Sequence, residues 1–139
     1  MKEFLRIMIP KYARSIYENE EAAKHVQSLK ISGQTTPIYN GKYVDINDNT
    51  GRTERARRYN MTLSNKRALA MYNFIFDDDE MTDYRYRNRL KKDMGISALG
   101  FQNAKPVQPE LVGKVADCLE YDCMKEQATI LQFRLFSEE

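Results

Sequence analysis

Residues 59–75 read YNMTLSNKRALAMYNFI, a pattern typical of a loop that delivers the chain into a helix. Ser64 is a good N-cap residue, because its hydroxyl can accept a hydrogen bond from one of the first free N–H groups of a helix. The apolar residues beyond it recur at spacings of three and four: Ala68, Met71, Tyr72 and Ile75. This spacing predicts a helix from Ser64 to about Phe76 with one apolar face.

Arg67 would lie in the first turn of that helix. The helix dipole favours an anion at this end, so Asp or Glu would suit the position better than a cation. An exposed arginine paired with a carboxylate is the ordinary explanation for such a residue. The unfavourable placement of the charge instead indicates a task for Arg67 outside the helix.

The same stretch resembles the signature of the OmpA/MotB C-terminal family, which binds peptidoglycan. That family reads Gly-His-Thr-Asp, then a variable loop, then Asn-x-x-Leu-Ser-x-x-Arg-Ala leading into a helix. Five residues match the second part at every spacing: Asn60, Leu63, Ser64, Arg67 and Ala68. Residues 33–36, which read GQTT, stand where Gly-His-Thr-Asp would be.

The resemblance covers roughly residues 9–136. Residues 95–106, GISALGFQNAKP, follow the family's outline of helix end, strand and Asn-x-Pro. The family enters its last strand with Asn-Arg-Arg-Val-Glu-Ile, whereas residues 125–130 read KEQATI and lack both arginines. The family's opening strand, before the first helix, has no counterpart in this sequence.

Length and composition predict one domain over residues 1–139. The chain is long enough for a core, and its 42% apolar and 30% charged residues are ordinary for a soluble globular protein. The net charge of +2 is too small to indicate a polyanionic partner. No stretch reaches the length of a membrane span. The resemblance implies a piece of a longer envelope protein, attached to a membrane only through a segment absent from this chain.

The order of the expected elements predicts an α+β fold. Helical spacing indicates helices over 4–17, 21–26, 64–76 and 84–94, the last capped by Asp83 and ended by Gly95. Alternating apolar residues indicate strands over 28–35, 96–101 and 128–136. Residues 36–58 are rich in turn formers and predict a loop insert. By the resemblance, this is an OmpA-like domain with helices packed on one face of a small mixed β-sheet.

Two charged patterns have ordinary interpretations. Residues 45–51 partly imitate a calcium loop, but position twelve is Ala56 instead of Glu, so an Asn/Asp-rich turn is favoured. The basic runs within 52–58 and 85–92 are interpreted as solvated helix faces in preference to a nucleic-acid surface, because the acidic residues 77–80 adjoin the second run.

No catalytic motif or metal-binding cluster is recognisable, and His25 is the only histidine. We expect no enzymatic activity, no cofactor and no metal.

Cys118 and Cys123 are the only cysteines and lie five residues apart. They can form a short-loop disulfide in an oxidising compartment or remain two free thiols. Several OmpA-like domains carry a cysteine pair just before their last strand. The resemblance therefore favours the disulfide.

The resemblance also implies a ligand site. In the family, the loop after the first of these strands and the start of the helix form a groove for the peptide stem of peptidoglycan. Diaminopimelate in that stem presents a carboxylate and an ammonium group. Arg67 would bind the carboxylate with its planar pair of donors, and Asn60, beside Tyr59, would frame the peptide. Leu63 and Thr35 complete the candidate set.

Thr36 is the departure from the family pattern. It stands where the family has the Asp that binds the ammonium group, so that ion pair would be lost. Asp45 and Asp48 in the insert are the nearest replacements in sequence. If one of them took this role, Thr36→Asp should strengthen binding.

The predicted function is therefore a non-catalytic domain that anchors an outer-membrane or stator-like protein to the cell wall, in the periplasm or cell envelope. A homodimer is compatible with this function. The alternative is a protein-interaction module that kept the fold and lost peptidoglycan binding. Thr36 and the missing arginines near Gln127 motivate that alternative.

Overall fold

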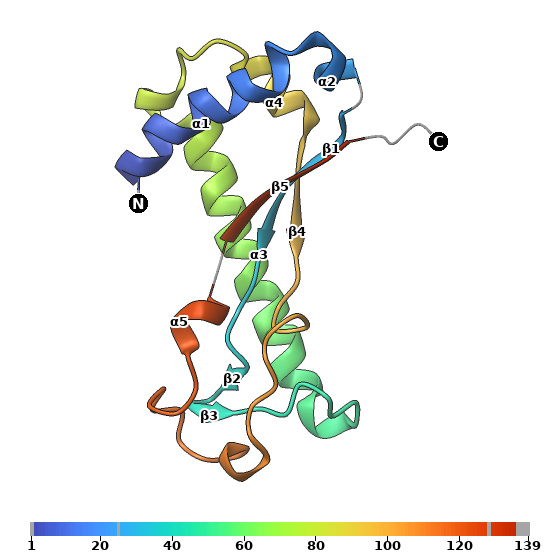
Figure 1. The fold of residues 1–139 in the computed structure, drawn as a ribbon. Coiled ribbons are helices and arrows are strands. Elements are labelled where there is room, and N and C mark those ends of the chain that lie inside the picture. The colour runs from blue at the N-terminus through green and yellow to red at the C-terminus, as the bar shows by residue number, and fades with distance from the viewer. Residues whose placement is uncertain (1, 25, 128, 136–139) are drawn as a thin grey trace. The chain divides into compact units, whose positions relative to one another are not determined.

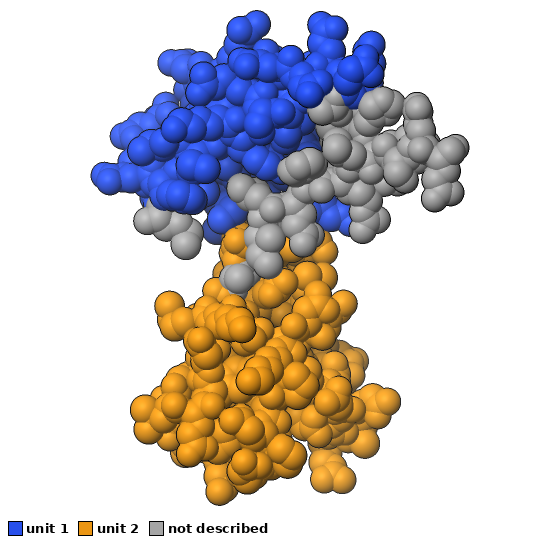
Figure 2. Space-filling model, in the orientation of Figure 1, with its two compact units in different colours: residues 1–31, 69–96, 131–139 blue, residues 32–68, 97–130 orange. Residues whose placement is uncertain are grey.

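The computed structural model describes residues 2–24, 26–127 and 129–135, without the side chains of residues 22, 26–28 and 130–135. The chain divides into two compact units, shown in blue and orange in Figure 2. Unit 1 comprises residues 1–31, 69–96 and 131–139, and unit 2 comprises residues 32–68 and 97–130.

The fold mixes helices with a small sheet, which is compatible with the expected α+β class (Figure 1). A three-stranded sheet has the order β4-β1-β5, and a separate hairpin pairs β2 with β3 in antiparallel fashion. The helices are α1 Lys2–Tyr17, α2 Glu20–Lys24, α3 Glu54–Asp77, α4 Arg87–Asp93 and α5 Cys123–Glu126. The strands are β1 Val26–Gly33, β2 Ile38–Tyr39, β3 Lys42–Tyr43, β4 Met94–Ala98 and β5 Thr129–Leu135.

Helix α1 confirms the prediction made from its apolar spacing. The side chains at the predicted positions are all buried in unit 1: Leu5, Ile9, Ala13 and Ile16. Pro10 lies inside the helix. Helix α1 also contacts α3. The guanidinium of Arg6 lies 5.7 Å from the ring centroid of Phe74, near the C-terminal end of α3. Figure 1 shows α1 crossing this end of α3.

Helix α3 begins ten residues earlier than the sequence predicted, at Glu54 instead of Ser64. The buried residues of its first half keep the helical spacing but are small or polar: Ala56, Asn60 and Ser64. A search for apolar periodicity does not detect such a stripe. Ser64 is consequently an interior residue and not the N-cap. Arg67 lies in the middle of the helix, where the dipole argument for a misplaced charge does not apply.

The predicted loop insert over 36–58 is correct only up to the short helical turn Gly51–Thr53, because residues 54–58 belong to α3. Its first part forms the β2–β3 hairpin, with Asn40 and Gly41 at positive φ. Arg57 of α3 holds the rest, since its Nη2 donates to the carbonyls of Ile46 and Asp48 at 2.6 and 2.8 Å.

Residues 45–51 form the expected Asn/Asp turns. The carboxylate of Asp45 accepts the backbone N–H of Asn47 at 2.9 Å, and that of Asp48 accepts the N–H of Thr50 at 2.9 Å. Hydrogen bonding from Thr50 holds the pKa of Asp48 below its usual value. Within the described ranges, no group of three His, Cys, Asp or Glu side chains is placed to hold a metal ion.

Helix α4 and strand β4 also differ from the prediction at their ends. The helix begins at Arg87, preceded by Tyr86 in the left-handed region, and Asp83 does not cap it. Met94 is already extended, with φ −91° and ψ 128°, so Gly95 lies inside β4 and is not the residue that ends the helix. The chain passes from helix to strand without a turn, which removes the need for a terminating glycine.

The three strands of the larger sheet agree with the prediction with small shifts. β1 spans Val26–Gly33 where 28–35 was expected, and β4 spans Met94–Ala98 where 96–101 was expected. β5, Thr129–Leu135, lies within the predicted 128–136. Residues 25, 128 and 136 lie outside the described residues, as do the side chains on which the predicted alternation along the last strand rests.

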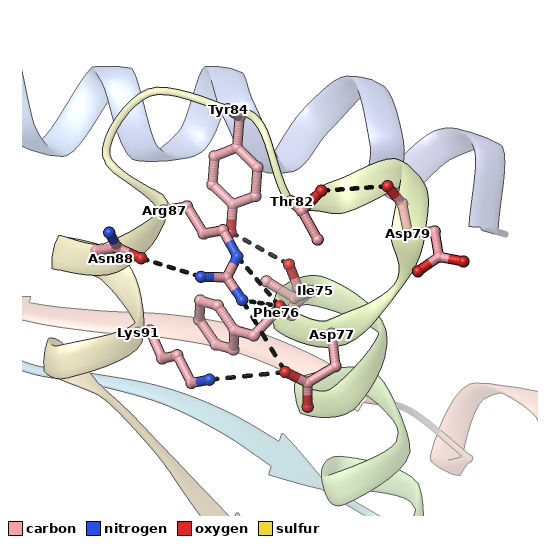
Figure 3. Close-up of polar contacts among 9 residues, drawn as sticks. All are labelled: Ile75, Phe76, Asp77, Asp79, Thr82, Tyr84, Arg87, Asn88 and Lys91. Carbon is pink, nitrogen blue, oxygen red and sulfur yellow. Dashed lines mark hydrogen bonds and ion pairs between the residues drawn. The ribbon is translucent and has the colours of Figure 1, made fainter.

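The C-terminal end of α3 is capped by the segment that follows it (Figure 3). The hydroxyl of Tyr84 donates to the carbonyl of Ile75 at 3.3 Å, and Arg87 donates to the carbonyl of Phe76 from Nε at 3.1 Å and also from Nη2. Lys91 lies 3.6 Å from the Asp77 carboxylate. Asp77 of the acidic stretch thus pairs with two cations of the second basic run, Arg87 and Lys91, as their adjacency in the sequence predicted.

Arg87→Met should lower the free energy of unfolding by about 2 kcal/mol, because the carbonyl of Phe76, a residue that is 0% exposed, would lose its charge-assisted donors at the helix end. Lys92→Met is the matched control on the same helix, since Lys92 is exposed, and it should change stability by less than about 0.5 kcal/mol. Urea denaturation of the two variants measures the difference. Equal effects would show that Arg87 does not cap α3.

Candidate functional site

The candidate site lies within unit 2, where the end of β1 rests directly on α3. A Cβ atom added to Gly33 would lie 2.0 Å from the backbone oxygen of Ser64. Only glycine fits at this distance. The two parts of the sequence signature, residues 33–36 and 60–68, therefore pack against each other through their backbones.

The hydroxyl of Ser64 ties a third segment to this contact. It accepts the backbone N–H of Gly100 at 3.0 Å and donates to the carbonyl of Met61 at 2.9 Å. Gly100 adopts a φ of +54°, and its carbonyl accepts the N–H of Thr35 at 2.8 Å. These bonds satisfy polar groups that close packing removes from water.

Three of the predicted site residues are buried here. Asn60 donates its amide to the carbonyls of Ile38 and Ala56 at 3.0 and 2.9 Å, and Thr36, 3% exposed, donates to the carbonyl of Cys123 at 2.8 Å. The Thr35 hydroxyl is buried with no hydrogen-bond partner among the described residues. In this structure Thr35, Thr36 and Asn60 hold the fold together and offer no surface to a ligand.

The other three predicted residues form a ridge at intervals of four along α3: Tyr59, Leu63 and Arg67. Tyr59 is 54% exposed, and Leu63 and Arg67 are half-buried at the margin of the buried stripe. One Nη of Arg67 lies 3.5 Å from the carbonyl oxygen of Gln34. Among the described residues, no carboxylate lies within ion-pair distance of Arg67.

Two residues beside this ridge were missed by the sequence analysis. Gln34 supplies the carbonyl that contacts Arg67. Tyr39 packs edge-on against Tyr59, with 5.6 Å between the ring centroids. Gln34 lies within the signature segment 33–36 and so carried a signal, whereas nothing in the sequence links Tyr39 of the insert to α3.

Asp45 and Asp48, the expected replacements for a carboxylate at position 36, lie in the turns that follow β3. They line an open hollow of about 300 Å³ whose wall also includes Tyr39, Lys42 and Arg52. Neither Thr36 nor Arg67 is among the described residues that line it. Both aspartates already accept hydrogen bonds within their own turns. A role for either aspartate in binding the ligand ammonium stays a prediction.

Cys118 and Cys123 are bonded to each other, as the resemblance favoured, with 5.7 Å between their Cα atoms. The loop that they close is held at both ends. The Tyr43 hydroxyl accepts the N–H of Cys118 at 2.8 Å, and the Cys123 carbonyl accepts the Thr36 hydroxyl. Nearby, burial raises the pKa of Tyr121 to about 12, and its hydroxyl donates to the carbonyl of Lys105.

No protein-family model, curated protein or solved structure matches this chain. Within the described ranges, no helix combines the length and apolar character needed to cross a bilayer. The geometry is therefore the basis for a functional assignment. On α3 it presents a half-buried arginine with no carboxylate in ion-pair distance among the described residues, beside an exposed tyrosine and a leucine.

Gly33→Ala should lower the free energy of unfolding by about 3 kcal/mol, because a methyl group would overlap the backbone of α3. Gly51→Ala is the matched control in the same unit, since a Cβ there has open space around it, and it should be nearly neutral. Chemical denaturation compares them. A stable Gly33→Ala protein would show that β1 does not approach α3 this closely.

Thr36→Asp should destabilise the fold by about 3 kcal/mol at neutral pH, the opposite of a gain in binding, because it buries a carboxylate against the Cys123 carbonyl. Burial raises the pKa of such an acid, so the loss should grow as the pH rises and shrink as it falls, when the protonated group can donate to the carbonyl. Thr36→Ser keeps the donor and is the control. Thermal melts at acidic and alkaline pH test this dependence.

Proposed function

We propose that this chain is a non-catalytic, OmpA-like domain that binds peptidoglycan and anchors a protein of the cell envelope to the wall. The observation that carries the proposal is the ridge of α3. Its arginine occupies the position of the family's ligand-binding arginine, and no described carboxylate neutralises it. An uncompensated, half-buried guanidinium is suited to bind a ligand carboxylate.

The packing beneath the ridge supports this assignment. Gly33 and Ser64 bring the two parts of the signature into backbone contact, so a groove beside Arg67 would have a rigid floor. The Gln34 carbonyl restrains the guanidinium from one side. A restrained arginine loses less conformational freedom when it binds a ligand, which favours affinity.

In the proposed complex, Arg67 binds the free carboxylate of the diaminopimelate-containing stem peptide through two parallel N–H donors. Leu63 and the exposed ring of Tyr59 would pack along the aliphatic part of the stem. The ammonium group would lack an ion pair at position 36, because Thr36 is buried and directed to the Cys123 carbonyl. We therefore expect binding that depends chiefly on the ligand carboxylate.

The disulfide supports a periplasmic or cell-envelope location. Cys118 and Cys123 are paired in the structure, and structural disulfides persist in oxidising compartments. The proposal involves no cofactor and no metal.

Arg67→Ala should reduce retention on purified peptidoglycan sacculi roughly tenfold to a hundredfold, the loss of about 1.5–3 kcal/mol for a charge-assisted hydrogen bond. Lys66→Ala is the matched control, because Lys66 is the neighbouring cation and is exposed on α3. Sedimentation of each variant with sacculi measures retention. Equal retention of the two variants would remove Arg67 from the site.

A second candidate function is a protein-interaction module that has lost the wall ligand. The burial of Thr36, Thr35 and Asn60 favours it, since half of the predicted ligand set is occupied inside the fold. Titration with a diaminopimelate-containing stem peptide separates the candidates. Saturable binding that requires Arg67 supports the wall anchor, whereas no binding at millimolar peptide supports the interaction module, including a homodimer.

A further inference from the structure

Four side chains of unit 1 form a continuous stack in which two tyrosine rings lie between two arginines. The guanidinium of Arg89 lies 4.7 Å from the ring centroid of Tyr17, the Tyr17 and Tyr86 centroids are 5.7 Å apart, and the guanidinium of Arg85 lies 5.1 Å from the Tyr86 centroid. The tyrosine Tyr17 comes from α1, and the other three residues come from α4 and the turn before it. The two rings lie next to each other in the middle of the stack, and each contacts one guanidinium on its outer side, a cation–π arrangement that restrains both arginines.

The stack is fixed by its tyrosines. Tyr17 is buried, and its hydroxyl donates to the carboxylate of Asp93 at 2.7 Å and lies 3.3 Å from the carbonyl of Arg89. Tyr86 has a φ of +73°, a left-handed conformation that a bulky residue rarely adopts. The chain accepts an unfavourable backbone conformation at the residue that places the second ring.

The arginines of the stack retain free charge. Arg85 and Arg89 are exposed, and Arg85 lines an open hollow together with Pro10, Arg14 and Glu18. In the described part of the chain, no carboxylate lies within ion-pair distance of Arg14, Arg85 or Arg89, although Arg87 and Lys91 of the same segment contact Asp77. Glu18 is the only acidic residue in the described lining of the hollow. Because Arg14 and Arg85 also line it, the net charge of this lining is positive.

The outer face of α1 adds an apolar stripe beside this charge. Phe4 and Ile7 are 61% and 59% exposed, and Met8 is also exposed, at helical spacing on the side opposite the buried residues. Lys11 and Arg14 each follow one of these residues by seven positions, so they continue the same face. Exposed apolar residues joined to basic ones on one helix face are typical of helices that lie on a membrane surface.

We propose that unit 1 binds the surface of an anionic phospholipid bilayer. Phe4, Ile7 and Met8 enter the boundary between headgroups and acyl chains, and Arg14, Arg85 and Arg89 bind lipid phosphates through the N–H edges that stacking leaves free. A soluble phosphate or an oligonucleotide would leave the apolar stripe in water. A lipid surface is the partner that uses both features.

This membrane contact goes beyond wall anchoring and does not rest on it. The stack and the stripe belong to unit 1, whereas the Arg67 ridge belongs to unit 2. Variants of one site can therefore be tested without changing the other.

The test is co-sedimentation of the full chain with vesicles of phosphatidylcholine alone or with a third of the lipid replaced by phosphatidylglycerol. We expect at least about tenfold more binding to the anionic vesicles, with the difference falling as salt is raised. Arg85→Glu should abolish most of the difference. Arg55→Glu makes the same charge change at an exposed arginine of unit 2 and should leave binding unchanged.

The double variant Phe4→Ser, Ile7→Ser tests the apolar part, and thermal melts check that it remains folded. It should lower vesicle binding about tenfold while Arg67-dependent retention on sacculi is unchanged. Equal effects of Arg85→Glu and Arg55→Glu would overturn the proposal. So would Arg85-dependent binding of pyrophosphate or single-stranded oligonucleotide without vesicle binding, or self-association that the double variant removes.

Discussion

The close approach of β1 to α3 at Gly33 and Ser64 is the constraint on which unit 2 depends. Because position 33 has no side chain, two backbones meet at a distance that excludes any Cβ. Such an approach buries backbone N–H and C=O groups, which then require hydrogen-bond partners. The hydroxyl of Ser64 supplies two of these bonds, one from the N–H of Gly100 and one to the carbonyl of Met61. The same contact brings Gln34 beside Arg67, so the candidate ligand site is a consequence of the packing beneath it.

Helix α3 is stabilised mainly by hydrogen bonds in one half and mainly by hydrophobic burial in the other. In unit 2 its buried stripe is small or polar, and hydrogen bonds from Asn60 and Ser64 replace apolar contact. In unit 1 its buried residues include Phe74, Ile75 and Phe76, which supply the larger hydrophobic term. The helix end in this half is then closed by donors from Tyr84 and Arg87, which lie beyond it in sequence.

The arginines of the chain divide by what they contact. Arg57 and Arg87 donate to backbone carbonyls and act as structural ties. Arg67, Arg85 and Arg89 have no described carboxylate in ion-pair distance and present their charge at the surface of their own units. This division, more than the net charge of +2, motivates an anionic wall peptide as the proposed ligand of one unit and anionic lipid as that of the other.

The sequence by itself determined the elements whose signals are local. Apolar spacing located α1, side-chain chemistry located the turns at Asp45 and Asp48, and the spelling of residues 60–68 singled out Arg67. Tertiary structure alone decided where α3 begins and that Thr36 and Asn60 are buried, because their partners lie far away in sequence or on another element. The Tyr17–Tyr86 stack also depends on such distant pairing. Apolar periodicity indicates which residues are buried against other apolar side chains. It does not indicate burial against backbone, nor which aromatic rings folding brings together.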